Sequence, residues 1–161
     1  MKNLIIIRHA KSSWAAPLFD KDRTLSSRGI NDAHLVSSNV IQYLPKTFII
    51  WSSTARRAAE TALIFTQNFS CPEESIVFKD ELYTFDAAKL EKIVKSCNND
   101  YDSVILFGHN EAITDFVNKF GDVYIDNVAT SGFVSLQFDA NSWESIQKGK
   151  TKRVVFPKDL K

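Results

Sequence analysis

Two histidines and several arginines stand where they could share one anion. Arg8 and His9 directly follow the apolar run Leu4–Ile7, and His109 follows another such run, within FGHNE. A third apolar run leads into SSTARR, which carries two more arginines. Arginine offers planar, permanently charged donors that match a phosphate group, and a neutral imidazole can act as nucleophile or base. The combination predicts a phosphate site that contains a nucleophile.

Each of these features taken alone also has a structural explanation. A single histidine such as His109 is more often structural than catalytic, and we favour a structural role for His34. Arg56 and Glu60 are four residues apart and could form only an exposed helical ion pair. Three other cations could be surface charges: Lys11, Arg23 and Arg28. The phosphate site is favoured because three separate junctions carry groups suited to the same ligand.

The apolar runs predict the strands that position these side chains. Three runs are continuous rather than alternating, which is typical of strands buried on both faces: Leu4–Ile7, Phe48–Trp51 and Val104–Phe107. The last third of the chain differs, because its apolar residues alternate or are sparse. It predicts antiparallel or edge strands at Phe133–Phe138, Trp143–Gln147 and Arg153–Phe156.

Helical patterns separate the strands. We expect one helix from the N-cap Ser26 to just before Pro45, and a second over about 54–68. Two more are expected after the caps Asp86 and Asn110, the last one ending at Gly121. Strands that alternate with helices predict a single three-layer α/β/α domain over residues 1–161 with a mostly parallel sheet. Ligands of such folds bind at the carboxyl ends of the strands, where Arg8, His9 and His109 lie.

Composition restricts the class of protein further. The chain has 161 residues and a net charge of +1, which gives no overall attraction to nucleic acid or to an anionic membrane. Cys71 and Cys97 form no CxxC pair, so neither a disulfide framework nor a zinc site is expected. No apolar run approaches the roughly 18 residues of a membrane span, and a cytoplasmic location is the default expectation.

Four motifs together resemble a known family. RHAKSSW, DRTLSSRG, SSTARRAAET and FGHNE, in this order between residues 8 and 111, are similar to motifs of the histidine phosphatase, or phosphoglycerate mutase-like, superfamily. Their order and spacing most resemble its SixA-type phosphohistidine phosphatases. The resemblance implies a three-layer α/β/α fold and a reaction that needs neither metal nor cofactor.

The resemblance also implies roles for individual residues. The Arg-His pair of the family falls on Arg8 and His9, which makes His9 the nucleophile that becomes phosphorylated. The pattern Ser-x-x-x-Arg-x-x-x-Thr selects Arg57 rather than Arg56, and His109 matches the second histidine. Substrate-binding roles are expected for Arg23, Ser53 and Asn110. The arginines around His9 should also lower its pKa and keep it neutral.

The sequence departs from the family at the proton donor. Larger members carry a glutamate that protonates an alcohol leaving group, and the nearest candidate here is Glu81, in KDELYTFD, whose surroundings do not match that motif. Without an acid, an activated leaving group such as the imidazole of phosphohistidine is favoured, carried by a partner protein. The alternatives are a small-molecule phosphatase or mutase of the same superfamily, and a non-catalytic phosphate-binding regulatory domain.

Overall fold

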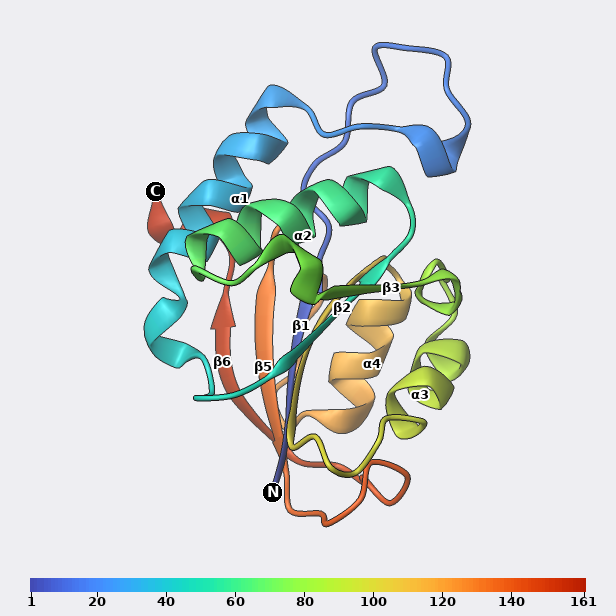
Figure 1. The fold of residues 1–161 in the computed structure, drawn as a ribbon, viewed down its shortest axis with the longest axis vertical. Helices are drawn as coiled ribbons and strands as arrows, with labels where there is room; N and C mark the ends of the chain where they lie inside the picture. Colours follow the sequence, from blue (N-terminus) through green and yellow to red (C-terminus); the bar gives the residue numbers. More distant parts are fainter.

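Six strands form one mixed sheet in the computed structural model, which describes residues 1–161 (Figure 1). Their bounds are Lys2–Arg8 (β1), Ile49–Ser53 (β2), Ile76–Lys79 (β3), Ser103–Gly108 (β4), Phe133–Phe138 (β5) and Lys150–Val155 (β6). The spatial order is β3-β2-β4-β1-β5-β6. The first four strands in this order are parallel, whereas β5 and β6 add antiparallel at one side. The antiparallel additions in the last third were expected.

Four helices cover the two faces of this sheet, as the sequence predicts. They are Ser27–Asn39 (α1), Arg56–Asn68 (α2), Ala87–Lys95 (α3) and Ala112–Phe120 (α4). Helices α1 and α2 pack on one face, and α3 and α4 pack on the other (Figure 1). None of the helices combines the length and the apolar character that crossing a membrane requires.

The central strand β1 explains why its apolar run is uninterrupted. Ile5 and Ile7 belong to the core beneath α1 and α2, whereas Leu4 and Ile6 belong to the core beneath α3 and α4. Successive side chains of a strand point to opposite faces, so a strand covered on both sides needs an apolar residue at every position. Burial on both faces holds β1 in place, and its last residue, Arg8, lies at the carboxyl end of the strand.

Two predicted elements are wrong in detail, and one strand was not predicted. The segment 143–147 forms no strand, because the buried Trp143 side chain donates its indole N–H to the Tyr101 carbonyl instead. Strand β3 was missed, since it is an edge strand and only its first residue is fully buried. Helix α1 ends at Asn39, and a separate 3₁₀ turn over Ile41–Tyr43 continues its apolar pattern.

The predicted helix caps fall into two groups. Ser26 and Asp86 cap as expected, because their side chains accept hydrogen bonds from the backbone N–H groups of Gly29 and Ala88. Asn110 is not the N-cap of α4: the N-cap is the next residue, Glu111, and the helix begins at Ala112. Its side-chain oxygen nevertheless accepts a hydrogen bond from the N–H of Thr114, in the first turn of that helix.

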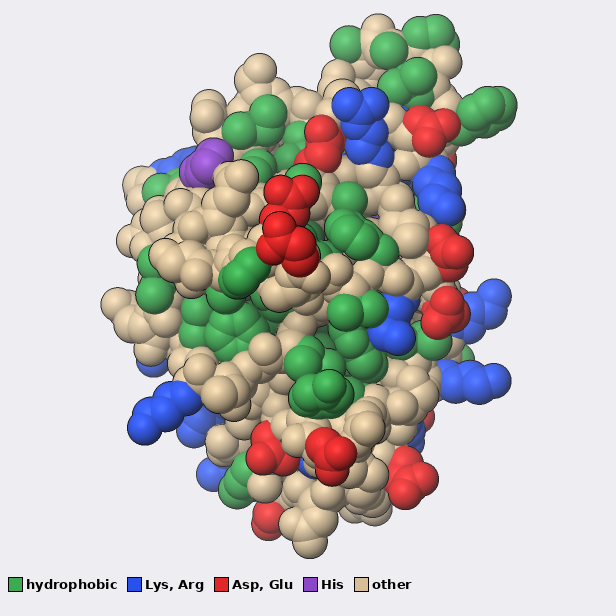
Figure 2. All heavy atoms as spheres, in the orientation of Figure 1, with side chains coloured by type: hydrophobic (Ala, Val, Ile, Leu, Met, Phe, Trp, Pro, Cys, Tyr) green, Lys and Arg blue, Asp and Glu red, His purple; other side chains and the backbone are tan.

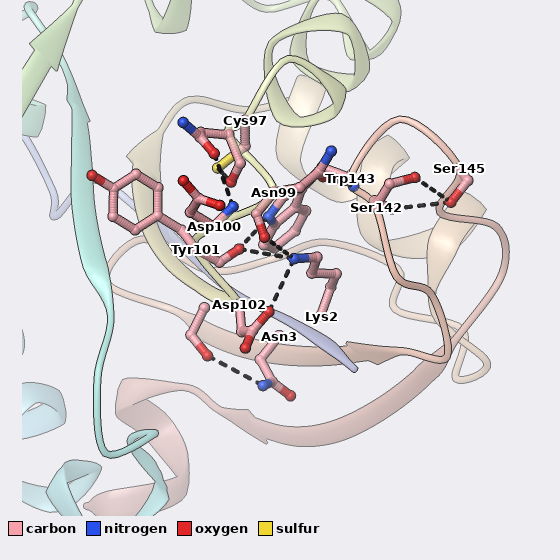
Figure 3. A network of polar contacts seen from close by, with 12 residues as sticks. Lys2, Asn3, Cys97, Asn99, Asp100, Tyr101, Asp102, Ser142, Trp143 and Ser145 are labelled. Carbon is pink, nitrogen blue, oxygen red and sulfur yellow. Dashed lines mark hydrogen bonds and ion pairs between the residues drawn. The ribbon is translucent and has the colours of Figure 1, made fainter.

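A buried lysine, Lys2, stabilises the start of β1, at the end of the strand opposite Arg8 (Figure 3). The Lys2 ammonium donates hydrogen bonds to the carbonyls of Asn99 and Tyr101, at 2.8 and 3.2 Å, and to the Asp102 carboxylate at 3.0 Å. Trp143 completes the cluster, because its backbone N–H donates to the Asn99 side chain at 2.7 Å. These contacts tie the start of β1 to the loop before β4, its parallel neighbour.

Candidate active site

Three neighbouring strands bring the predicted residues together. Because β4 lies between β1 and β2, the strand ends that carry Arg8, Ser53 and Gly108 are adjacent. Arg8 is in register with Gly108, so the residues that follow each of them, His9 and His109, emerge side by side. Their ring centroids are 5.2 Å apart. The parallel sheet therefore creates the pair of imidazoles from residues a hundred positions apart.

The reactive nitrogen of His9 is selected by its own backbone. Nδ1 lies 2.7 Å from the carbonyl oxygen of Ala10, so Nδ1 carries the proton and Nε2 keeps its lone pair. Burial, together with the charges of Arg57, Arg8 and Arg23, lowers the pKa of His9 from 6.5 to about 4, against the opposing effect of the Ala10 carbonyl. His9 is therefore a neutral imidazole near pH 7, with an unprotonated Nε2 whose lone pair accepts a hydrogen bond from Arg57 Nε.

Arg57 reaches this nitrogen from the first turn of α2. Its Nε lies 3.3 Å from His9 Nε2, and the side chain is only 3% exposed. Arg56, one residue earlier, is 59% exposed and lies 3.8 Å from Glu60 on the surface. Thr61 joins the helix to the nucleophile, because its hydroxyl donates to the Arg57 carbonyl and accepts from the N–H of Ala10.

His109 is held on its other side by Ser53. Its Nε2 lies 2.8 Å from the Ser53 hydroxyl, while Nδ1 is buried and has no partner. Tyr83 and Phe85 pack edge-on against its ring, with centroids 5.3 and 5.5 Å away. Burial, together with His9 and Arg57, lowers its pKa to about 3. His109 is thus a neutral ring whose Nδ1 makes no hydrogen bond within the protein.

Unpartnered polar atoms gather around His9. Buried donors and acceptors almost always find a partner, so each exception indicates an absent one. Four side-chain atoms in the whole chain are exceptions: Arg8 Nε, Arg23 Nε, His109 Nδ1 and Ser131 Oγ. Ser131 belongs to the same place, because its N–H donates to the carbonyls of Arg8 and His9. The site therefore has hydrogen-bonding groups near the nucleophile that no protein atom uses.

Other predicted residues have different surroundings. Arg23 is buried and stacks on the Trp14 ring, with its guanidinium carbon 3.4 Å from the ring centroid, and it also donates to Ser12. The Asn110 amide group binds Thr114 and Asn127. Glu81 is exposed on the 3₁₀ turn Asp80–Leu82, and no hydrogen bond or ion pair connects it to the site.

Two residues that the sequence analysis missed complete the site. The Asp20 carboxylate accepts from Arg57 Nη2 at 2.9 Å and from the Tyr83 hydroxyl. Burial opposes the ionisation of Asp20, but the hydrogen bonds from Tyr83 and Arg57 outweigh burial and hold its pKa below the ordinary value. The only sequence signal was an acidic residue three positions before Arg23, in DKDR.

The charges of the site suit a dianion. Arg8, Arg23 and Arg57 supply three positive charges against the one carboxylate of Asp20, while both histidines are neutral. No three histidine, cysteine or acidic side chains are grouped as metal ligands would be. Guanidinium groups around a neutral imidazole can bind a phosphoryl group and present a nitrogen nucleophile to its phosphorus atom.

Comparisons with known proteins agree with this geometry. The family model described as histidine phosphatase superfamily (branch 1) matches residues 4–103. An uncharacterized chloroplastic protein of Arabidopsis thaliana is 30% identical, over 89% of this chain and 69% of the relative. An uncharacterized protein of Mycobacterium leprae is 28% identical over 93% of this chain and 98% of the relative.

Solved structures share the fold at lower identity. The protein histidine phosphatase SixA, complexed with tungstate, superposes with a TM-score of 0.82 at 20% identity, over 99% of both chains. SixA of Agrobacterium tumefaciens gives 0.76 at 24%, covering 96% of this chain and 97% of that one. A phosphoserine phosphatase of Entamoeba histolytica, solved as a mutant, gives 0.64 at 15% over the whole of both chains.

Proposed function

Since the chain belongs to branch 1 of the histidine phosphatase superfamily and is a phosphatase, we propose that His9 removes the phosphoryl group from phosphohistidine on a partner protein. The observation that carries this proposal is the set of unpartnered polar atoms around the neutral His9 ring. These atoms would be available to bind phosphoryl oxygens while Nε2 attacks the phosphorus atom. Arg8, Arg23, Arg57 and His109 would bind those oxygens.

The reaction would take two displacements at phosphorus. In the first, the lone pair of His9 Nε2 forms a bond to phosphorus, and the electron pair of the breaking P–N bond goes to the leaving imidazole nitrogen, which takes a proton from water. In the second, water attacks the phosphohistidine, loses a proton to solvent, and the P–Nε2 electron pair returns to His9. The guanidinium groups stabilise the charge on the equatorial oxygens in both steps.

The leaving group that this site favours depends on whether a side chain can donate a proton to it. Asp20 is the one carboxylate in contact with the arginines, and its lowered pKa leaves it ionised near pH 7, unable to donate a proton. Alkoxides leave poorly without a proton donor, whereas imidazole leaves more easily. A P–N substrate therefore suits this site better than an alkyl phosphate ester.

A small-molecule ester phosphatase is the second candidate. It is favoured by structural neighbours such as the mycobacterial glucosyl-3-phosphoglycerate phosphatase, which has a TM-score of 0.68 and 14% identity over 95% of this chain and 98% of that chain. Glu81 would then have to approach the leaving group as the acid. Its exposed position would require the turn Asp80–Leu82 to move.

A substrate panel tests both candidates. Phosphate release would be measured from a phosphohistidine protein, phosphoramidate, aryl phosphates and alkyl phosphates, for the wild type and for His9→Ala. We expect release from the P–N substrates and acidic aryl phosphates, little from alkyl phosphates, and none with His9→Ala. We also expect a chelator to change nothing, because the arginines already supply the positive charge. Rapid hydrolysis of alkyl esters that Glu81→Gln abolishes would select the second candidate.

A further inference from the structure

Asp20 contacts two of the arginines that would bind the proposed phosphoryl group, Arg57 and Arg23. Its Oδ2 accepts from Arg57 Nη2 at 2.9 Å and from the Tyr83 hydroxyl, and its Oδ1 lies 3.8 Å from Arg23 Nη1. Its backbone carbonyl accepts from Arg57 Nη1 at 2.6 Å. One residue thus supplies two oxygens to the arginine expected to bind substrate, in the forked arrangement that phosphate itself favours.

These contacts use three of the five N–H donors of Arg57, one on each nitrogen. Nε points to His9, and both terminal nitrogens point to Asp20. The nucleophile and its neighbours are also buried: His9 is 8% exposed, Arg57 3% and His109 1%. A phosphoryl group can receive the forked pair of hydrogen bonds that Nη1 and Nη2 now give to Asp20 only if Asp20 moves away.

The segment that carries Asp20 can move without disrupting the core. Residues 11–24 project from the body of the protein as a loop (Figure 1), and hydrophobic side chains cluster on its outer part (Figure 2). Trp14 is 78% exposed and Phe19, next to Asp20, is 85% exposed. The base of the loop is fixed, because Ser12 pairs with Leu25 and the Thr24 hydroxyl donates to Glu60. Movement can therefore be confined to the outer part.

We propose that Asp20 is an internal competitor of phosphate, which holds Arg57 when the site is empty and returns to it as the product leaves. This inference rests on the proposed phosphatase site. Two anions cannot share the same forked pair of Arg57 donors, so a substrate that uses this pair must displace the Asp20 carboxylate. Inorganic phosphate makes the fewest other contacts that could offset this displacement. Asp20 would thereby weaken product inhibition and favour substrates that gain binding energy outside the phosphate pocket, as a phosphorylated protein does.

Direct binding of inorganic phosphate and orthovanadate tests the proposal, by isothermal titration calorimetry without turnover. Asp20→Asn keeps the shape and removes the charge, and we expect it to bind phosphate about tenfold more tightly than the wild type. Asp22→Asn is the matched control, since Asp22 is exposed on the same turn and forms no ion pair; its affinity should equal that of the wild type. Tyr83→Phe removes only the hydroxyl that holds Asp20, and should tighten binding about threefold.

Each outcome separates this inference from the function on which it rests. Equal or weaker phosphate binding by both Asp20→Asn and Tyr83→Phe, with normal phosphatase activity in the wild type, overturns the competitor role alone. Unchanged phosphate affinity combined with slower turnover of poor leaving groups would make Asp20 a proton donor instead. Absence of both phosphate binding and phosphatase activity from the wild type and all variants would defeat the proposed function as well.

Discussion

His9 is chemically defined by the two groups that contact its ring nitrogens. The Ala10 carbonyl fixes the proton on Nδ1. Arg57 Nε donates a hydrogen bond to Nε2, and its guanidinium is permanently charged, so it cannot act as a base. This arrangement leaves Nε2 as the nucleophile in the resting protein. No carboxylate is required to orient the ring, because the backbone of the next residue does so.

Covalent trapping tests the nucleophile. After brief incubation with labelled phosphoramidate and quenching in base, we expect label on His9, stable in base and lost in acid, because that is the behaviour of phosphohistidine. Mass spectrometry of the digested protein would locate it. Label that persists in His9→Ala would assign the reaction to another residue, with His109 the first to be examined.

Arg57 and Arg56 should differ strongly in function although they are adjacent. Arg57→Ala removes a buried guanidinium that contacts His9, so kcat/KM should fall by about 10²–10³-fold. Arg56→Ala removes an exposed side chain paired only with Glu60, and the change should stay within about twofold. Steady-state kinetics with an aryl phosphate would compare them. The opposite ranking would show that α2 is placed in the wrong rotation.

The pH response of the two site histidines should be displaced towards acid. Burial lowers the pKa of His9 to about 4 and that of His109 to about 3, so both rings should stay neutral well below pH 6.5. Nitrogen chemical shifts of the rings, assigned with His9→Asn and His109→Asn, would show this in protein free of phosphate. Because the unfolded chain takes up these protons first, the free energy of unfolding should fall as pH decreases from about 6.5 towards 4. Rings that titrate near 6.5 would contradict the buried site.

At the scale of elements, Gly29 sets how closely α1 approaches the 11–24 loop. A Cβ atom at this position would lie 2.1 Å from the carbonyl oxygen of Lys11, which also accepts hydrogen bonds from the N–H and hydroxyl of Ser26. The start of α1 therefore fixes the base of the loop that carries Asp20 and Arg23. Any larger residue has to displace backbone rather than a flexible side chain.

Gly29→Ala should consequently destabilise the protein, by about 1–3 kcal/mol, since overpacking forces the backbone to shift. Gly108→Ala is the control, because a Cβ there meets only side chains, the nearest atom 3.5 Å away. Urea unfolding of both variants would measure the difference. A loss as large in Gly108→Ala as in Gly29→Ala would show that the contact with Lys11 has no special weight.

The sequence predicts elements well where burial dictates the residue pattern, and poorly where it does not. The strands β1, β2 and β4 were located because burial on both faces demands unbroken apolar runs. Strand β3 was missed because an exposed edge strand does not need an apolar run. The 143–147 segment was predicted as a strand although its Trp143 is buried in a loop. Asp20 was missed because its role arises only when a surface loop folds back over α2.

At the scale of the molecule, the Lys2 cluster holds the end of the sheet remote from the site. Lys2→Met should lower the free energy of unfolding by about 2–3 kcal/mol, since it removes three hydrogen bonds donated by a buried ammonium group, to the carbonyls of Asn99 and Tyr101 and to the Asp102 carboxylate. Lys152→Met, on the exposed surface of β6, should change it by less than about 0.5 kcal/mol. Chemical denaturation would measure both. Equal stability of the two variants would mean that water replaces the ammonium without cost.

The central position of β1 has a consequence for how the chain is made. Its two partners in the sheet are β4 and β5, which end at Gly108 and Phe138, so the first strand to leave the ribosome is among the last to be paired. At ordinary rates of translation this delay is on the order of ten seconds. Until β4 emerges, the apolar segment Leu4–Ile7 has no partner strand within the nascent chain, and until β5 emerges it has only one. A ribosome that stalls before β4 emerges therefore exposes an unpaired apolar strand to which chaperones can bind.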